Sequence, residues 1–442
     1  MACSPDEEII SGDHNLKLQI SADTVLFDTL LSERTSITRR LRIYNFNESA
    51  VLLDRIKLGQ AENSAYSLVI NGQEGKVIED EILFGGDSML VLINVSIDPL
   101  NTNSPYLVKD SVIVEWNNNQ FDVKLIAWGQ DANYFRKYEV LCDQVLTAER
   151  PYVFTDTTLI GADCEITIEP GARLYFDQSA ILFVAGHLNV IGEADQQVVF
   201  RNSRFDEDYL RAPGQWKGVY FLEGGTGTFH HAVLENATHA ITVGAPDSDT
   251  IPEVILTNSI IRHSSKTGIR GFTSDIRATN CLIFDAGEAL IYNVAGGSYQ
   301  YDHCTFANYP RSFISENPSV IFADFYWLAN ETILTDQLHV SLTNSIIWGE
   351  NRQELLDTIA FAHGSTSFVF NNIISASTDI GFNETSIADN FPRFIDPFTF
   401  QYEIDSISPA IDRSLNKRLE IDLRGKLRDG IPDLGAYEYI SN

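Results

Sequence analysis

Three polar side chains that could hold or act on a ligand fall close together in the chain. Lys266 and Arg270 lie four residues apart, and Tyr292 follows Arg270 by 22 positions. In a strand, if Ile269 points into a core, its neighbour Arg270 points out. A repeat of this period would then bring Tyr292 out beside Arg270. We therefore expect Lys266, Arg270 and Tyr292 to form one patch, with two positive charges and a phenol to meet a polar or anionic ligand.

This placement depends on a phrase, Leu-Thr-Asn-Ser-Ile-Ile at residues 256–261, that returns along the second half of the chain. Its polar position is occupied in turn by Asn258, Asn280 and His303, whose two intervals differ by a single position. Asn344 and Asn371 take the same place in two later copies. A nearly fixed period in this range indicates a fold of stacked repeat units.

Apolar residues alternate over short runs within each repeat, which favours strands over helices. A repeat of this length fits three strands of about five residues and three turns, and such units stack as coils of a parallel β-helix, roughly 4.8 Å apart. The side chains expected to form an inward ladder that hydrogen-bonds from coil to coil are Asn258, Asn280, His303, Asn344 and Asn371. The alternative is a β-sandwich in which the similarity is accidental. The interval before Asn344 is nearly twice the others, which indicates an insertion or an extra coil.

The first part of the chain, residues 20–131, has a different pattern. Short alternating stretches between Thr24 and Trp128 are separated by turn signals such as Asn71-Gly72. Strands at this spacing predict an antiparallel β-sandwich. The stretch at 40–45 resembles a strand of immunoglobulin-like modules of the adhesive or spacer kind, which implies presentation or binding rather than catalysis.

The chain as a whole is expected to be all-β. Its expected parts are an acidic tether at 1–19, an immunoglobulin-like sandwich at 20–131, a connector at 132–151, a parallel β-helix at 152–394 and a C-terminal cap at 395–442. The 61 acidic and 31 basic residues give a net charge of -30, which disfavours contact with nucleic acid and with anionic membrane surfaces. No run of apolar residues long enough to span a membrane is present, so we expect no membrane-spanning segment. We also expect no nucleic-acid partner and no cofactor.

The first residues, Met-Ala-Cys-Ser-Pro before an acidic run, resemble the mature start of a bacterial lipoprotein, whose cysteine carries lipid. The resemblance implies lipidation at Cys3 and contact with a membrane only through that anchor. It also implies a place at the cell surface or outer membrane of a Gram-negative bacterium. It requires that a signal segment was removed or lies upstream. The alternative is a cytosolic protein with an ordinary cysteine at position 3.

Two stretches in the second half carry a resemblance of their own. Residues 166–176, with Ile-Glu-Pro-Gly-Ala at their centre, and residues 215–220 resemble coils of the right-handed β-helices of the pectin-lyase-like superfamily. That superfamily includes polysaccharide lyases, in which a base takes a proton beside a uronate carboxylate that a cation neutralises. An enzyme of this kind would here use Arg270, Lys266 or Tyr292. No other coil adds a second cation in register with them.

The end of the chain resembles the choice-of-anchor segment that follows β-helices in bacterial surface proteins, in three stretches at 408–412, 422–425 and 432–439. The glycine usual after Ser-Pro-Ala-Ile-Asp is replaced here by Arg413-Ser414-Leu415. A solenoid leaves strand edges open at its ends, and terminal segments commonly cover them. We expect residues 395–442 to act as such a cap.

Aromatic rings exposed on a solenoid face would suit sugar rings. Trp216 and Trp327 are the first candidates for such contacts, followed by Tyr220 and Trp348. Packing inside the solenoid is the alternative for each of them.

Histidines and cysteines give weaker signals. The histidines at ladder positions would lie several coils apart, too far to share one ion, so we expect no metal site. Cys281 and Cys304 are expected in register on adjacent coils as small stacked side chains, and the pairing of Cys142 with Cys164 is left open.

These features together favour a non-catalytic binding protein of the cell surface, with a polysaccharide as the first expected partner. A polysaccharide lyase-like enzyme acting on an acidic glycan is the alternative. A structural or adhesion component of the surface is a second alternative. A lyase would need clustered charges along one strand face, whereas a binding module would need exposed aromatic rings without that cluster.

Overall fold

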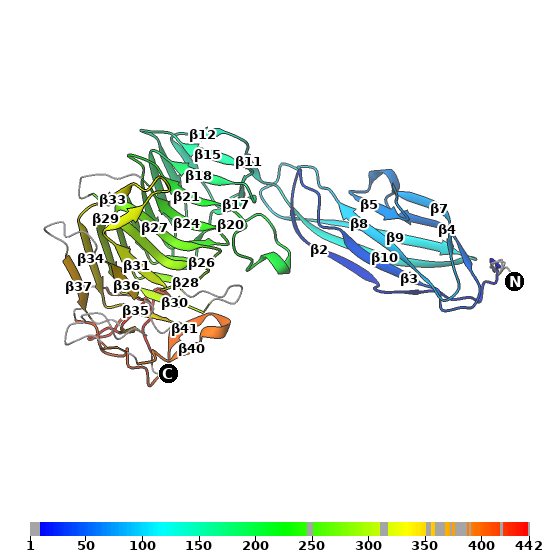
Figure 1. Ribbon diagram of the computed structural model, residues 1–442. Coiled ribbons are helices and arrows are strands. Elements are labelled where there is room, and N and C mark those ends of the chain that lie inside the picture. The colour runs from blue at the N-terminus through cyan, green and yellow to red at the C-terminus, as the bar shows by residue number, and fades with distance from the viewer. Residues whose placement is uncertain are drawn as a thin grey trace. The chain divides into compact units, whose positions relative to one another are not determined.

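The computed structural model describes residues 9–244, 251–309, 317–350, 355–358, 367–371, 374–375, 387–388, 390–415 and 419–440. The chain forms two compact units, residues 1–132 and residues 133–442 (Figure 1). Both consist of strands with short 3-10 turns, so the expected all-β class, a sandwich followed by a parallel β-helix, is confirmed. Among the described residues, no helix has the length and apolar character that a membrane crossing requires.

The strands of the first unit, with one 3-10 turn, are β1 (Gln19–Ile20), β2 (Thr24–Leu31), β3 (Arg39–Tyr44), β4 (Val51–Leu58), η1 (Ala61–Asn63), β5 (Tyr66–Ile70), β6 (Gln73–Gly75), β7 (Val77–Leu83), β8 (Ser88–Val95), β9 (Tyr106–Trp116) and β10 (Asn119–Gln130). They form two five-stranded sheets, in the orders β1-β3-β8-β5-β6 and β2-β10-β9-β4-β7. Alternate residues of β8 are buried, as expected for strands that pack one face on a shared core. The sandwich departs from a purely antiparallel arrangement at one edge, where β2 pairs with β10 in parallel.

The residues before β1 pack on the sandwich from residue 9 onward, although a free tether was expected over 1–19. Trp116 donates its indole N–H to the carbonyl of Leu16, and the Asn117 amide donates to the carbonyl of Ser11. These bonds satisfy backbone groups of the segment, so the tether prediction is wrong for its second half. Cys3, the expected lipidation site, lies outside the described residues.

The second unit contains the remaining elements. They are β11 (Asn133–Phe135), β12 (Glu139–Leu141), β13 (Gln144–Leu146), β14 (Tyr152–Phe154), β15 (Thr157–Ile160), β16 (Glu165–Ile168), β17 (Arg173–Phe176), β18 (Ile181–Val184), β19 (His187–Ile191), β20 (Val198–Asn202), η2 (Glu207–Tyr209), β21 (Gly218–Phe221), β22 (Thr226–His230), β23 (Ala232–Glu235), β24 (His239–Val243), β25 (Val254–Thr257), β26 (Ile260–Ser264), β27 (Thr267–Thr279), β28 (Leu282–Ala286), β29 (Ala289–Asp302) and β30 (Thr305–Asn308). They continue as β31 (Val320–Ala323), β32 (Phe325–Trp327), β33 (Ile333–Thr335), β34 (Leu338–Thr343), β35 (Ile346–Gly349), β36 (Leu355–Thr358), β37 (Ser367–Asn371), β38 (Ile374–Ser375), β39 (Ile387–Ala388), β40 (Phe394–Asp396), η3 (Pro397–Thr399) and β41 (Gln401–Ile404).

Parallel pairing between successive coils builds the solenoid, whose strands stack in order in Figure 1. One sheet of 11 strands runs from β11 to β39, and one of 16 strands contains β12, β21, β27 and β29. The stack begins at β11, which pairs with β14, while β12 pairs with β15 and β13 with β16. Residues 132–151 therefore include the first coil, and the prediction of a connector there is wrong. Their mixed charged and aromatic composition hid strands that are each only 3 residues long.

The repeated polar position is a turn residue in the left-handed backbone conformation. His231, Asn258, Asn280, His303 and Asn344 have φ between 47° and 56°. Asparagine tolerates this conformation better than most residues with a side chain, which explains why it recurs there. The strands on either side pair in parallel, with Thr257 opposite Thr279 and Ile260 opposite Leu282. The turns of adjacent coils thus lie one upon another.

Hydrogen bonds link the first three of these turns. The Asn280 amide donates to the amide oxygen of Asn258 at 2.6 Å, and the Asn258 amide lies 3.2 Å from Nε2 of His231. Since an amide NH₂ only donates, that imidazole nitrogen accepts. Burial, and then the charge of His230, lower the pKa of His231, in keeping with a neutral ring.

The ladder changes partners at its later members. The Asn344 amide donates to Asp302, and Nε2 of His303 lies 3.2 Å from the Ser414 hydroxyl. Asn371 lies opposite Thr343 and not opposite Asn344. The next strand pair has the same offset, with Ile374 opposite Ile346. The prediction of Asn371 as a ladder residue is therefore wrong by one position, and its side chain lies outside what the structure describes.

The C-terminal segment packs on the outer face of the 11-stranded sheet and on the ladder turns beside it. Leu282, Phe284 and Ile346 on that face share an apolar cluster with Tyr402 and Leu434. These contacts cover the flank of several coils, whereas a cover for the open end was expected. The C-terminal segment therefore covers the ladder, and the ladder side chains are not confined to the interior of the solenoid as an inward ladder would be.

A buried arginine fastens this segment to the ladder. The side chain of Arg428 is fully buried, pairs with Glu438 at 3.0 Å and donates to the amide oxygen of Asn280 at 3.0 Å. Glu438 also accepts from the backbone N–H of Asp433. Burial raises the pKa of Asp433 to about 6. A buried ion pair with several further hydrogen bonds can fix one arrangement of the segment even where its net stabilisation is small.

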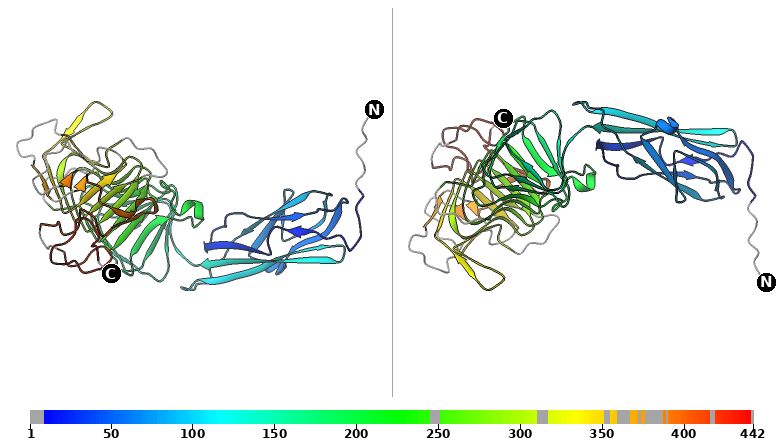
Figure 2. Two further views of the ribbon diagram at one scale, coloured as in Figure 1. Left: turned by 90° about the horizontal axis from the view of Figure 1, so that it is seen from below. Right: turned by 90° about the horizontal axis from the view of Figure 1, so that it is seen from above.

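The long interval before Asn344 contains an insertion. Asp302 at the end of β29 pairs directly with Thr343 of β34, so no extra ladder position lies between them. Part of the added chain forms an antiparallel hairpin of β32 and β33. Figure 2 shows this hairpin as a yellow projection from the solenoid.

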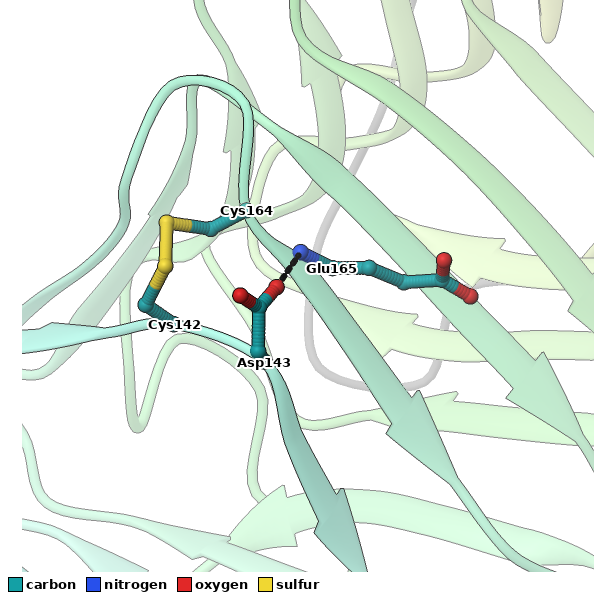
Figure 3. The surroundings of a disulfide bond; sticks show 4 residues. All are labelled: Cys142, Asp143, Cys164 and Glu165. Carbon is teal, nitrogen blue, oxygen red and sulfur yellow. Dashed lines mark hydrogen bonds between the residues drawn. A yellow bond between two sulfur atoms is a disulfide. The ribbon is translucent and has the colours of Figure 1, made fainter.

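A disulfide joins the first coil to the second. Cys142 and Cys164 are 22 residues apart, one coil period, with Cα atoms 4.7 Å apart. Figure 3 shows the carboxylate of Asp143 beside the bond, accepting from the backbone N–H of Glu165. Cys281 and Cys304 are buried free thiols whose flanking strands β28 and β30 are in register.

We expect the double change Cys142→Ser with Cys164→Ser to destabilise the first two coils by about 3 kcal/mol, the chain-entropy value for a loop of this length. Because coils of a solenoid can open locally, hydrogen exchange of the β12 and β15 amides is the suitable measurement. A reducing agent should accelerate exchange in the unchanged protein and have no added effect in the variant. Equal exchange in the two proteins would contradict a stabilising role for the bond.

Candidate functional site

Outward-pointing residues at one position of successive coils form a column on the 16-stranded sheet. The register aligns Phe183 of β18, Tyr220 of β21, Thr242 of β24, Arg270 of β27, Tyr292 of β29 and Ile321 of β31. We call these six residues the outer column. Their neighbours along each strand, such as Ile269 and Ile291, are fully buried in the core. Alternation along the strands therefore turns the column outward, and the aromatic rings and Arg270 keep part of their surface exposed.

Aromatic rings surround the guanidinium of Arg270. Its Cζ lies 5.9 Å from the ring centre of Tyr220 and 5.4 Å from that of Phe272. Both distances are in the range of cation–π attraction. Phe183 meets Tyr220 edge to face, with ring centres 5.9 Å apart. In the described residues of the outer column, Arg270 is the one charged side chain.

A buried histidine accepts a hydrogen bond from Arg270. Nη1 of Arg270 donates to Nε2 of His239 at 3.3 Å, and Nδ1 of His239 lies 2.8 Å from the Thr267 hydroxyl. A guanidinium only donates, so Nε2 accepts and the proton of the neutral ring sits on Nδ1. Burial, and then the positive charges of Arg270 and Lys266, lower the pKa of His239 to about 4. The ring is therefore neutral near pH 7 and can accept from Arg270.

The inserted hairpin borders the column. Tyr326 of β32 meets Phe272 of β27 edge to face at 5.0 Å. Burial is the largest cause that raises the pKa of Tyr292, and Tyr326 adds to it. The phenol of Tyr292 therefore stays protonated near neutral pH and can both donate and accept hydrogen bonds.

The residues expected in the patch are brought together only in part. Arg270 and Tyr292 are register partners on adjacent coils. Lys266 lies in the turn before β27 and forms an exposed ion pair with Glu288 at 3.0 Å, outside the column. Exposed pairs of this kind are weak and exchange with solvent. His239 was not foreseen, although residues 239–243 match the pattern of residues 267–271 and could have been aligned with them.

Two of the tryptophans differ in their exposure to solvent. Trp216 is fully buried, stacks on Phe176 at 4.0 Å and donates its N–H to the carbonyl of Glu235. It belongs to the aromatic core of the solenoid, so its prediction as a ligand-binding residue is wrong. Trp327 on the hairpin is 56% exposed, and its contact with a ligand stays a prediction.

The outer face of the 11-stranded sheet and the outer column differ in what covers them. On the 11-stranded sheet, outward residues such as Leu282 and Phe284 are buried by the C-terminal segment. On the outer column, Tyr220 and Tyr292 remain partly exposed. Within the described residues, no group of three or more His, Cys, Asp or Glu side chains could hold a metal ion. The chemistry that the outer column offers is thus stacking on aromatic rings and hydrogen bonding from a guanidinium.

Comparisons with known proteins were made for the whole chain. No family model and no curated protein matches it. Solved structures that resemble it include the PapD-like domain 7 of human CEP192, at 14% identity, covering 30% of this chain and 96% of that one, with a TM-score of 0.18. The catalytic domain of a GH87 alpha-1,3-glucanase in complex with tetrasaccharides matches at 10% identity over 76% of this chain and 80% of that one, also with a TM-score of 0.18.

A family 123 glycoside hydrolase from Clostridium perfringens matches at 9% identity with a TM-score of 0.18. The match covers 28% of this chain and 30% of the hydrolase. At such TM-scores these likenesses carry no argument about activity or ligand.

We expect the His239 imidazole to titrate with a pKa of about 4 when followed by NMR. Because this value is below the ordinary 6.5, stabilisation by the neutral ring is complete above pH 6.5 and is lost as the pH falls toward 4. Arg270→Gln should raise the pKa of His239 only part of the way to 6.5, since burial is the larger cause. Arg277→Gln, a change to an exposed arginine of the same strand, is the control. A wild-type pKa near 6.5 would contradict the contact between His239 and Arg270.

Proposed function

We propose that this protein is a non-catalytic glycan-binding protein and that the outer column is its binding face. A glycan chain lies along the solenoid axis, with sugar rings on Tyr220 and Tyr292 and hydroxyl or carboxylate groups on Arg270. Aromatic side chains offer an apolar face with a polar edge, and arginine offers several donors in one plane, so the two together suit sugars.

One observation carries this proposal: the column keeps Tyr220, Arg270 and Tyr292 partly exposed along one line of the solenoid, while the chain itself covers the outer face of the 11-stranded sheet. Three steps of roughly 4.8 Å separate Tyr220 from Tyr292, a span of about 14 Å that matches a few sugar rings in a row. The resemblance of residues 166–176 to the pectin-lyase-like superfamily supports the choice of a polysaccharide.

The column favours binding over catalysis. A lyase needs a base that can take a proton and a cation that holds the substrate. The protonated guanidinium of Arg270 suits the second role, and the raised pKa of Tyr292 disfavours the first.

We place the protein outside the cytoplasm. The disulfide between Cys142 and Cys164 supports this, since such bonds persist in oxidising compartments. The acidic surface, with a net charge of -30, keeps such a protein soluble and apart from anionic membranes. Lipidation at Cys3 and a place at a bacterial cell surface remain part of the proposal. Mass spectrometry of the native N-terminal peptide would reveal the lipid or its absence.

The binding face is tested by calorimetry with a panel of acidic and neutral polysaccharides. Tyr220→Ala and Arg270→Ala should each weaken binding about tenfold or more, a loss of roughly 1.4 kcal/mol. Arg277→Ala is the matched control, because Arg277 is an exposed arginine of the same strand β27 but lies outside the column. It should bind like the unchanged protein.

Three results would overturn the proposal. The column would be ruled out as the site if Arg277→Ala weakened binding as much as Arg270→Ala does. It would also be ruled out if no polysaccharide of the panel bound. Formation of new unsaturated or reducing ends that Arg270→Ala abolishes would instead show an enzyme.

A further inference from the structure

A cavity lies at the corner of the solenoid where the chain passes from the 11-stranded to the 16-stranded sheet. Its volume is about 270 Å³. It is lined by polar side chains on β20, on the turn after β17 and on the loop that contains η2. These polar residues are Gln178, Asn202, Ser203, Arg204, Tyr209 and Gln215.

An insertion creates this cavity. The chain between Asn202 at the end of β20 and Gly218 at the start of β21 occupies positions 203–217, whereas the matching turns after β17 and β23, at 177–180 and 236–238, are far shorter. Insertions in solenoids build loops at one face and commonly carry binding sites. The Asn202 amide donates to the carbonyl of Tyr209 at 2.8 Å, which ties the inserted loop to the coil.

The walls carry hydrogen-bonding groups without net charge. Arg204 lies with its Cζ 3.3 Å from the ring centre of Tyr209, and Asp206 neutralises its guanidinium at 3.0 Å. Gln178 and Gln215 add two amides, each able to donate and accept. The amide oxygen of Asn202, a residue only 1% exposed, has no hydrogen-bond partner. A donor group of a bound molecule would satisfy this buried acceptor.

We infer that this cavity, here called the corner pocket, binds a small neutral polyhydroxylated molecule, such as one sugar ring. Its volume of about 270 Å³ lies just below the roughly 300–1,000 Å³ of pockets that take drug-sized ligands, which suits one sugar ring better than a chain. A charged ligand would find no compensating charge beside it, since Arg204 is already paired with Asp206. The opening of about 800 Å³ in the first unit contrasts with it, because its walls carry Glu62, Lys76 and Lys109.

The pocket is tested on the full chain by saturation-transfer NMR and calorimetry with D-glucose, D-galactose, D-mannose and N-acetyl-D-glucosamine as probes. At least one sugar should bind, and Gln178→Ala, Gln215→Ala and Tyr209→Ala should each weaken that binding fivefold or more. Glu207→Gln, in the same 3-10 turn as Tyr209, is the control for the loop, and circular dichroism checks that each variant is folded. D-glucuronate should bind no more tightly than D-glucose.

Arg270→Ala separates the pocket from the outer column, because it should leave monosaccharide binding unchanged even if it abolishes polysaccharide binding. The inference is overturned if none of the four sugars binds. It is also overturned if Gln178→Ala and Gln215→Ala bind as the unchanged protein does, or if Arg270→Ala removes the signal.

Discussion

A single backbone feature organises the later coils of the solenoid: at His231, Asn258, Asn280, His303 and Asn344 the chain turns at one residue in the left-handed conformation. Most side chains resist this conformation because their Cβ approaches the neighbouring carbonyl, and asparagine has the smallest penalty after glycine. Asn258 and Asn280 adopt this conformation with φ of 52° and 56°. Their amides also bond to each other across the coils. In these coils the turn thus sets where the next strand begins, and with it the register of the 11-stranded sheet.

That register decides which residues share a face. Near the turns Thr279 lies opposite Asp302, and earlier in the same two strands Arg270 lies opposite Tyr292, with a register shift between Phe272 and Ser274. A shift of one residue in the pairing of a strand would turn its outward side chains into the core. The outer column therefore depends on the pairing of β21, β24, β27 and β29 with one another, in addition to the turns.

The outer face of the 11-stranded sheet and the outer column differ in their exposure to solvent. Apolar side chains such as Phe284 point outward on the 11-stranded sheet and need cover, which the C-terminal segment supplies. Arg428 holds that segment by reaching the amide of Asn280. A face that the chain does not cover for itself can serve a ligand, because exposed aromatic surface gains free energy from any partner that shields it.

The repeat was legible in the sequence because an unusual backbone position selects the same residue type coil after coil. The period, the stacked coils and the pairing of Arg270 with Tyr292 all follow from counting between Asn258 and Asn280. Counting failed where two candidates stood side by side, as at Asn371 and its neighbour, and only strand pairing resolves such a choice.

Burial could not be read in the same way. Trp216 and Tyr220 lie close together in one coil, yet one stacks in the core and the other on the outer face. The first coil was hidden because its strands are short and its composition is charged. His239 was missed because its role depends on a contact with Arg270, distant in the sequence, that no local pattern reports.

The most direct measurement of the account is the unfolding free energy of two variants at one turn. Asn280→Ala removes the amide and keeps a Cβ, so it should cost about 2 to 4 kcal/mol. Asn280→Gly removes the amide but relieves the backbone, and it should be more stable than the alanine variant by about 1 kcal/mol. Gln300→Ala, at an exposed strand position, should change little. An alanine variant as stable as the unchanged protein, or a glycine variant no better than alanine, would contradict the turn as the element on which the solenoid depends.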